Sequence, residues 1–471
     1  MFRFLLHPIA LAVLVTLLIW FSIVVYWQQS MRPVTGGDIG IYLIGLPLAV
    51  IAIGFGLRAL YRRSKQAAPK SEAATANAAP AASTDEGERA YTMALLALGV
   101  ACAGGDDAAT VFQALKSRAL QPAPDGELRN RDGFPVHASR VQDLDTQEIQ
   151  AALASVDAAS HADSVLRALA LLKQSLAPVL DLAATVAPNP DKGSRMDPEA
   201  PLPRLVVDLL LPAAWEEHSR MSVARYIGSL IDASGWPATV CTLNTIAATE
   251  GTAALQRLDA FSLKANRAGS ADFYLLASCE STIDENVVSV LESGGLLFGS
   301  SNGQGRIPGE AAAAMLMQAT RGMTKTSAPL ALISRTALAV RGKSADAPGR
   351  IGHDTLQDIA QHCLEAAQLQ PAELGLAVSD ADQRSSRSGE CMNTINSLLP
   401  ELDPADDLIA TEQALGRLGA PGALVALGVA SGAVGTESKP VLLMAVSHAT
   451  ERAAVVLRPY AEPVEETVPA T

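Results

Sequence analysis

The sequence has few aromatic side chains and lacks a long basic run. Phe, Trp and Tyr make up 4% of the 471 residues, and 49 acidic side chains outnumber 36 Lys and Arg, which gives a formal net charge of −13. Proteins that bind nucleic acids present basic patches, and those that hold single strands add aromatic platforms for stacked bases. The composition therefore argues against a nucleic-acid partner.

Cysteine is also scarce, and its spacing excludes two classes of scaffold. The five cysteines are an odd number and contain no Cys-x-x-Cys pair; they are Cys102, Cys241, Cys279, Cys363 and Cys391. This pattern fits neither a disulfide framework nor a structural zinc site. Free thiols are typical of a reducing compartment.

The usual cofactor motifs are missing as well. The seven histidines are well separated, so a metal site would need unrelated ones to converge. Gly303, Gly305 and Gly309 do not form a dinucleotide fingerprint, because the last gap is one residue too long, and no phosphate loop follows. The Gly-x-Ser-x-Gly turn of many hydrolases is absent too. We expect no metal and no other cofactor.

Long apolar runs, by contrast, stand near the start of the chain. Phe4–Tyr26 and Ile39–Leu60 are nearly unbroken, and about 20 apolar residues suffice to cross a bilayer. The first run is too long for a signal peptide, and no cleavage site follows it. Basic residues cluster directly after the second run, at Arg58, Arg62, Arg63 and Lys65. By the positive-inside rule, residues 1–65 form a transmembrane hairpin, with spans at about 4–26 and 39–60, and the bulk of the chain lies in the cytoplasm.

Two segments lack the side chains needed for a core. Residues 66–90 are dominated by Ala, Pro, Ser and Thr, and we expect a flexible linker there. Residues 459–471 are rich in Pro and Glu and are expected to be a disordered tail.

The region between them, 91–458, alternates between short apolar runs and helical stretches. The helix that begins at Asp354 is the clearest, with a regular apolar stripe, Asp354 as its cap and Gln357 reaching back. Such alternation predicts an α/β domain with layered sheets. The runs that we expect to be strands are Met93–Val100, Leu205–Leu211, Phe273–Ala277, Leu330–Ser334, Leu374–Val378, Val441–Val446 and Ala453–Leu457.

Three segments of this region resemble β-ketoacyl synthases. Leu95–Leu115 reads as a strand, a Gly-rich turn and a helix, like the opening of those enzymes. Gly303–Ala312 is similar to their Gly-Phe-x-x-Gly-Glu-Gly-Ala turn, and Gly419–Leu427 to their Gly-Ala-Ala-Gly helix start. The order of the three is that of the family. The resemblance covers nearly the whole region from Tyr91 to Arg458.

This resemblance implies a thiolase-like fold, in which two similar halves stack as five layers, αβαβα. The boundary between the halves is expected at about residue 325. The family also dimerises through a continuous sheet, so the resemblance implies a homodimer or a heterodimer with a related protein.

The resemblance further implies a cysteine nucleophile at a helix start and two histidines that polarise a thioester, yet this chain departs from the family at each position. The nucleophile position falls near Ala248, and no cysteine stands there: Cys241 comes too early and Cys279 too late. The two histidine positions hold Ser379 and Gly416. We therefore expect no catalytic residue and treat Ala248, Ser379 and Gly416 as relics of a lost site.

Polar residues gather where the first histidine would stand. Asp380, Asp382, Arg384 and Arg387 form either a remodelled pocket or partner surface, or a solvated polar loop, and the solvated loop is the simpler interpretation. His448 lies at a strand end, where it is either a residual acid or base or, more simply, a structural histidine.

We weigh three functions. The favoured one is a non-catalytic adaptor or chaperone, because degenerate ketosynthase-like proteins of this kind, anchored in the inner membrane, are encoded beside type VI secretion effectors and are thought to load toxins onto the spike. A flexible tether fits such binding. The alternative is a membrane-bound acyltransferase or ketosynthase that acts on acyl-carrier or lipid substrates through Cys241 or Cys279. A sensor that uses the old acyl tunnel is the third.

Overall fold

The computed structural model describes Trp20 and residues 86–156, 159–188, 202–323, 328–349 and 352–461. The chain divides into two compact units, 1–81 and 82–471, and the description below concerns the second. Both expected membrane spans lie outside the described residues except for Trp20, as do 66–85 of the linker and 462–471 of the tail. The linker's end is helical, because Glu86–Arg89 forms the short helix α4.

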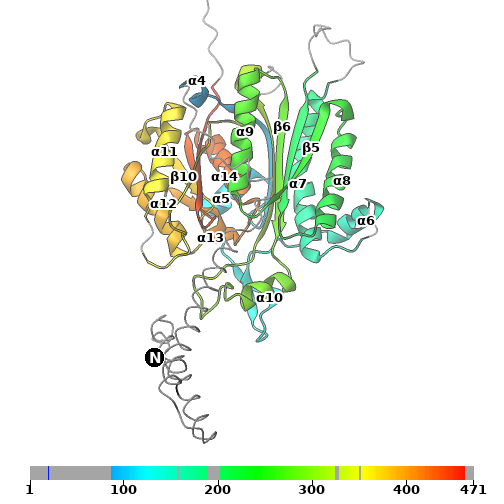
Figure 1. Cartoon of the computed structure of the whole chain (residues 1–471), viewed down its shortest axis with the longest axis vertical. Coiled ribbons are helices and arrows are strands. Elements are labelled where there is room, and N and C mark those ends of the chain that lie inside the picture. The colour runs from blue at the N-terminus through cyan, green and yellow to red at the C-terminus, as the bar shows by residue number, and fades with distance from the viewer. Residues whose placement is uncertain are drawn as a thin grey trace, which may run out of the picture. The chain divides into compact units, whose positions relative to one another are not determined.

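The first half of the unit contains seven strands and six further helices within its described residues (Figure 1). In chain order they are β1 (Met93–Cys102), α5 (Ala108–Lys116), β2 (Ala123–Arg129), β3 (Pro135–Ala138), α6 (Thr146–Val156), α7 (Asp163–Val186), β4 (Leu205–Pro212), α8 (Glu217–Ala233), β5 (Cys241–Ala248), α9 (Thr252–Ala268), β6 (Phe273–Ser281), α10 (Glu285–Ser293) and β7 (Glu310–Ala319).

The second half follows the same plan with fewer insertions. Its elements are β8 (Ala331–Ile333), β9 (Ala337–Val340), α11 (Asp354–Ala367), β10 (Leu376–Ser379), α12 (Ser385–Leu398), β11 (Leu408–Ala410), α13 (Thr411–Leu415), α14 (Gly422–Glu437), β12 (Val441–Ala445) and β13 (Glu451–Arg458). Short 3₁₀ turns lie at Ala238–Val240, Thr320–Gly322 and Pro371–Glu373.

The two halves share one strand order. Across the sheet the first half runs β5-β4-β6-β7-β1 and the second runs β11-β10-β12-β13-β8, with β9 attached to β13. If the strands of each order are numbered along the chain, without β9, both orders read third, second, fourth, fifth, first. The first pairs in each order are parallel, and the last strand added in sequence is antiparallel to its neighbours. The halves join where β1 pairs antiparallel with β8.

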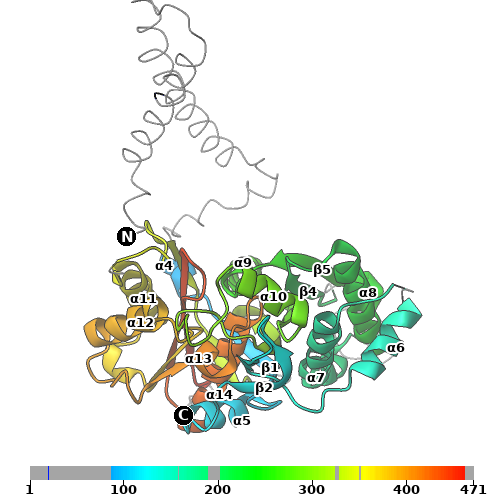
Figure 2. The same ribbon diagram turned by 90° about the horizontal axis from the view of Figure 1, so that it is seen from below.

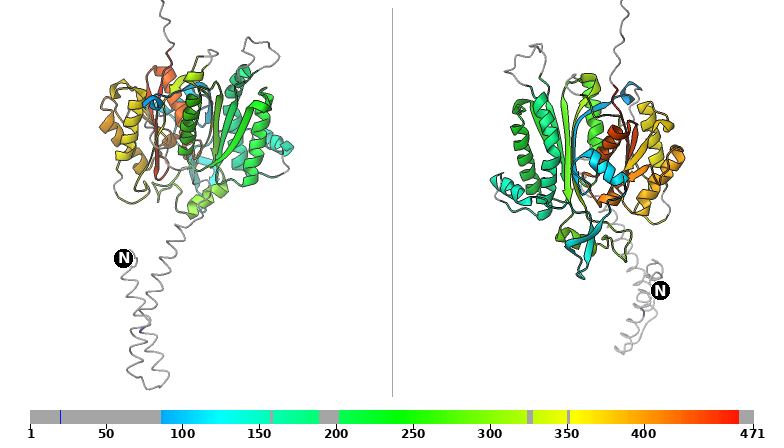
Figure 3. Two further views of the ribbon diagram at one scale, coloured as in Figure 1. Left: turned by 45° about the horizontal axis from the view of Figure 1, so that its top comes forward. Right: turned by 180° about the vertical axis from the view of Figure 1, so that it is seen from behind.

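We call the strands of the first half the first sheet and those of the second half the second sheet. The helices form three layers around these two sheets (Figures 1 and 2). α9 and α14 lie between the sheets and contact strands of both, with α5 beside α14. α7 covers the outer face of the first sheet, and α6 and α8 complete that layer. α11 covers the second sheet, and α12 packs beside it (Figure 3). The result is the five-layer αβαβα arrangement that the sequence predicted.

The central helix α14 is apolar on all sides because it is enclosed on all sides. Small residues let it approach its neighbours closely. A Cβ on Gly428 would collide with a methyl group of Val100 in β1, and one on Gly432 would collide with the carbonyl oxygen of Ala108 in α5. These two glycines therefore set the thickness of the middle layer.

One helix of the described part, α7, is long and apolar enough by composition to span a membrane. Its buried side chains instead join a core cluster with β1, β4, β6 and β7. Since the core of a soluble domain passes the same test, α7 is an element of the α/β domain.

The seven expected strands are all present, with ends displaced by a few residues. The helix expected at Asp354 is α11. The prediction that Asp354 caps it was wrong, because His353 is the N-cap residue, and it makes no side-chain capping bond. The boundary expected near residue 325 falls between β7 and β8.

Candidate functional site

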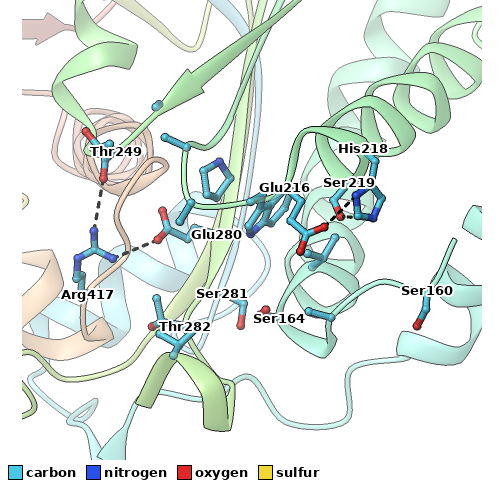
Figure 4. Close-up of a pocket in the computed structure, with 18 residues that line it drawn as sticks. Ser160, Ser164, Glu216, His218, Ser219, Thr249, Glu280, Ser281, Thr282 and Arg417 are labelled. Carbon is cyan, nitrogen blue, oxygen red and sulfur yellow. Dashed lines mark hydrogen bonds and ion pairs between the residues drawn. The ribbon is translucent and has the colours of Figure 1, made fainter. Parts of the chain in front are cut away.

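A largely buried ion network lies where three connections between elements of the second unit meet. Thr249 and Glu250 link β5 to α9, Glu280 stands near the end of β6, and Arg417 lies between α13 and α14. Arg417 Nη1 donates to Glu280 Oε1 at 3.1 Å and Nη2 to Glu250 Oε1 at 3.2 Å. Nη2 also lies 3.4 Å from the carbonyl oxygen of Thr249 (Figure 4). One guanidinium from the second half thus holds two carboxylates from the first.

Burial and the neighbouring charges shift the pKa values of these groups in opposite directions. Burial raises the pKa of Glu280, although Arg417 and the backbone N–H of Ala420 (2.8 Å from Oε2) favour its ionised form. Burial alone would lower the pKa of Arg417, but Glu280, Glu250 and Glu412 outweigh it and raise that pKa. Arg417 is therefore a fixed cation that cannot act as a base.

Glu412, in α13, adds an unusual carboxyl group to the same region. Its side chain is 1% exposed, and its Oε1 has no hydrogen-bond partner among the described residues. Burial, and then the negative charges of Asp380 and Glu250, raise its pKa well above the ordinary value. Burial thus favours the protonated form of Glu412. Gly422 leaves room for it, because a Cβ there would lie 2.6 Å from Oε1.

A cavity of about 400 Å³ opens beside this network. Thr249, Glu280 and Arg417 form part of its lining (Figure 4). Most of the remaining wall is apolar or carries small hydroxyl groups, and it is contributed by Ala162, Ser164, Val165, Pro212, Ala213, Ala214, Trp215, Ala248, Ser281, Thr282 and Val287. The cavity suits a small, largely apolar group.

Two imidazoles surround a serine at the mouth of this cavity. Ser219 Oγ lies 3.2 Å from His161 Nδ1 and 3.4 Å from His218 Nε2, and His218 Nδ1 lies 3.1 Å from Glu216 Oε2. The rings of His161 and His218 stack with centroids 5.7 Å apart. The order serine, histidine, carboxylate is that of an activated nucleophile, although 3.4 Å exceeds the usual serine–base distance of about 2.6–3.2 Å.

The structure brings together only part of the expected relic site. Ala248, the last residue of β5, lines the cavity with Arg417, the neighbour of Gly416. Gly416 itself has φ of +68°, and a Cβ there would lie 2.7 Å from the carbonyl oxygen of Pro308. Ser379 is not part of the cavity wall; its hydroxyl is buried against Cys391 Sγ at 3.2 Å.

None of the five cysteines has the environment of a nucleophile. Cys102, Cys279, Cys363 and Cys391 are buried, and Cys241 is partly exposed at the start of β5. Burial raises the pKa of every one of these thiols, to about 12 for Cys102, and Asp232 adds to the effect at Cys241. A reactive cysteine needs a lowered pKa, so neither Cys241 nor Cys279 gains support as a catalyst.

The polar loop after β10 is not solvated, so the simpler interpretation of it was wrong. Asp380, Asp382, Arg384 and Arg387 are all at most 9% exposed. Asp380 Oδ1 accepts from the backbone N–H groups of Val446 (2.5 Å) and Ser447 (3.1 Å), and burial raises its pKa to about 6. The loop is buried because its charges pair with one another and with the backbone.

Arg384 and Arg387 form the other side of this loop. Arg384 pairs with Asp382 at 2.6 Å and Asp346 at 3.0 Å, and Arg387 pairs with Asp346 at 2.6 Å. His448 Nδ1 accepts from the backbone N–H groups of Glu451 (2.9 Å) and Thr450 (3.2 Å), which is the geometry of a structural histidine.

Sequence reasoning missed Glu280, Glu250 and Arg417 as a unit. The residues that Arg417 binds lie 137 and 167 positions away in the chain. The available signal was a single arginine between two glycines, Gly416 and Gly419, in a turn that otherwise holds small and apolar residues. Among the residues that the structure describes, no group of three or more His, Cys, Asp or Glu side chains is arranged to hold a metal ion.

Comparison with known proteins identifies the fold. No family model and no curated protein matches the chain. The solved structures that it resembles include ketosynthases. The ishigamide ketosynthase/chain length factor is 17% identical with a TM-score of 0.54, over 79% of this chain and 100% of that one. The oxazolomycin ketosynthase domain from Streptomyces albus JA3453 is 14% identical with a TM-score of 0.57, over 79% and 75%.

A third similar structure is a type II PKS acyl-carrier protein in complex with its ketosynthase, at 12% identity and a TM-score of 0.55, over 79% of this chain and 100% of that one. At these identities the likeness concerns the fold alone. The thiolase-like ketosynthase fold that the sequence motifs implied is therefore confirmed.

Proposed function

We propose that this chain is a non-catalytic protein of the thiolase fold that binds another protein, as a membrane-tethered adaptor or chaperone for loading type VI secretion effectors. The observation that carries the proposal is the content of the ketosynthase positions. By the resemblance, the region of Ala248 holds no thiol and Ser379 and Gly416 stand at the two histidine positions. Arg417 with its two glutamates lies next to Gly416.

The chemistry of condensation supports this reading. A ketosynthase needs a thiolate to carry the acyl group and neutral imidazoles to polarise it. Arg417 supplies neither, because a guanidinium held by Glu250 and Glu280 keeps its proton. The network is well suited to hold the two halves together, and a rigid scaffold is what a binding protein needs.

A protein partner is consistent with the fold, since one of the similar structures is a ketosynthase in complex with an acyl-carrier protein. The edge of the first sheet offers a surface for a homodimer or a heterodimer. Among the residues that the structure describes, β5 is the last strand there and pairs with β4 alone, which leaves its other edge open for a partner strand. The two apolar runs, at about 4–26 and 39–60, support multi-pass attachment to the inner membrane, with the soluble domain in the cytoplasm.

The test is co-purification of the full chain from its native cell in mild detergent, at native expression, with partners identified by mass spectrometry. Recovery of a spike component, a PAAR-type protein or a toxin supports the adaptor. Recovery of acyl-carrier protein, with an acyl adduct on this chain, contradicts the proposal.

A second candidate is acyl transfer, and one observation favours it: the contacts of Ser219 with His218 and of His218 with Glu216 at the mouth of an apolar cavity. A fluorophosphonate probe, which labels activated serines, distinguishes the two. The adaptor predicts no labelling of the full chain. Labelling that Ser219→Ala abolishes and Cys241→Ala leaves intact supports the transferase.

A further inference from the structure

A second cavity, of about 640 Å³, lies beside α12 and is separate from the one in Figure 4. We call it the α12 cavity. Its wall comes from three segments: 295–306 before β7, 345–349 after β9, and 384–393 at the start of α12. Unlike the first cavity it is lined mainly by polar and charged residues. Neither the adaptor nor the transferase reading gives it a role.

Arg306 lines the α12 cavity and has no directly bound counter-charge among the described residues, although Glu250 and Asp346 attract it at longer range. Its side chain makes no hydrogen bond or ion pair with any described residue, although its backbone N–H and C=O pair with Leu296 and Phe298. Burial, and then the positive charge of Arg417, lower the pKa of Arg306. Proteins seldom bury a cation partly and leave it unpaired, because the lost hydration is not compensated. An anion from outside the chain would supply the missing charge.

Charged groups lie both in the wall of the cavity and behind it. The wall holds Arg306 and Arg384 with Asp346 and Glu390, and behind it lie Arg341, Arg387 and Arg452 with Asp382. Over both sets the excess is two positive charges, or one if the nearby Asp380 is counted. This local excess stands out in a chain whose formal net charge is −13.

The start of α12 adds hydrogen-bond donors to this cavity. The helix has 14 residues, its N-cap residue Arg384 makes no side-chain capping bond, and its first turn carries no acidic residue. Ser385 and Ser386 line the cavity. The backbone N–H and the hydroxyl of Ser385 donate to Gln304 Oε1, whereas the Ser386 hydroxyl accepts from Arg387 Nη1 and can still donate to a ligand. Beneath them the Nε of Arg387, a side chain that is 1% exposed, has no hydrogen-bond partner among the described residues. The dipole of a helix start favours a negative group at this place.

We propose that the α12 cavity binds a small organic phosphate, whose phosphoryl group lies between Arg306, Arg384 and the first turn of α12. A phosphate monoester carries about 1.5 to 2 negative charges at neutral pH, which matches the positive excess better than the single charge of a carboxylate. Guanidinium groups and serine hydroxyls are its usual ligands. The cavity is large enough to hold an organic remainder as well. The proposal goes beyond the adaptor function and does not depend on it.

The experiment is calorimetric titration of the full chain in mild detergent, with phenyl phosphate as the probe and benzoate as the singly charged control. We expect saturable binding of phenyl phosphate and at least tenfold weaker binding of benzoate. Arg306→Gln should weaken phenyl phosphate at least tenfold. Arg118→Gln, which removes the same charge from a side chain that is 63% exposed, should leave the affinity unchanged.

Thermal unfolding separates a ligand contact from a structural role of Arg306. Phenyl phosphate should raise the Tm of the wild type and not that of Arg306→Gln. Without phosphate, Arg306→Gln should be at least as stable as the wild type, because it lacks the unpaired cation. Arg306→Lys keeps the charge and serves if Arg306→Gln does not fold; it should bind phenyl phosphate more weakly than the wild type.

Absence of saturable binding to the wild type, or equal affinity of the wild type and Arg306→Gln, overturns the proposal. Co-purification of Arg306→Gln from its native cell addresses the adaptor separately. A retained protein partner with lost phosphate binding leaves that function standing, and a lost partner with retained phosphate binding leaves this site standing.

Discussion

At the scale of single residues, Arg417 is the cation on which the ion network depends. Arg417 neutralises Glu280 and Glu250, and the side chains of the three are 11–18% exposed. Removing one member of such a set leaves the other charges buried and unpaired, which is more harmful than never having buried them. The consequence can be measured directly.

Replacing Arg417 by Met should therefore lower the free energy of unfolding by about 3–5 kcal/mol. The measurement is chemical denaturation of the full chain in mild detergent. Combining it with Glu280→Gln, which removes one of the stranded charges, should recover part of the loss. A loss below about 1 kcal/mol, with no recovery in the double variant, would show that the ion network contributes little.

Glu412 gives a pH-dependent prediction. Its pKa is raised in the folded state, so the folded protein binds a proton that the unfolded chain releases above about pH 4.5. Stability from this group is present below that pH and declines as the pH rises, by up to about 1.4 kcal/mol per pH unit, until the raised pKa is passed.

Glu412→Gln mimics the protonated acid, so the stability of this variant should not decline in this way as the pH rises. The variant should be more stable than the wild type at pH 8, and the difference should shrink towards pH 5. Unfolding measured across this range checks it. Glu401→Gln, at an exposed glutamate, should show no such trend. If Glu412→Gln is instead less stable than the wild type by the same amount at both pH values, Glu412 is ionised in the folded protein.

At the scale of elements, the spacing of the middle layer depends on glycines in α14. Alanine is the better helix former by about 1 kcal/mol, so Gly→Ala in a helix normally stabilises. At Gly432 the added methyl group meets backbone of α5, whereas at Gly435, in the same helix, it meets nothing. Gly432→Ala should thus destabilise by about 1–3 kcal/mol, and Gly435→Ala should stabilise by up to about 1 kcal/mol. Denaturation curves of the two variants test this, and equal effects would contradict the close packing.

The edge strand β5 makes a prediction about assembly. If two copies join through it, Thr245→Lys places like charges at the shared edge and should convert the dimer to a monomer. Thr185→Lys, on the exposed face of α7, adds the same charge elsewhere and should leave the dimer intact. Sedimentation velocity in detergent gives the answer. A wild-type monomer would remove this interface from the proposal.

At the scale of the whole molecule, continuous apolar runs made most of the sheet predictable. β6 and β12 are buried along their full lengths, and such strands are apolar without alternation. β7 was not recognised as a strand, because its run of alanines has low strand propensity. It is a strand that pairs with both β1 and β6, with α7 packed on one of its faces and α9 and α14 on the other.

The candidate site was less predictable than the fold. The sequence motifs follow the chain order of the ketosynthases, and from them we predict relic positions at Ala248, Ser379 and Gly416. The ion network, the burial of the loop after β10 and the unpaired Arg306 depend on contacts between distant segments, such as Asp346 with Arg387. Spacing along the chain carries no information about such contacts.

The seam between the two halves also bears on how the protein is made. β1 pairs with β7 and β8, and Met93 lies opposite both Ala319 and Ile333. During synthesis at about 5–20 residues per second, the first strand therefore waits roughly 12–48 s for its last partner to leave the ribosome. Throughout that interval an apolar strand, whose side chains end up almost entirely buried, has an unpaired edge. Slowing translation before residue 333 should lengthen this exposure and increase aggregation of the nascent chain.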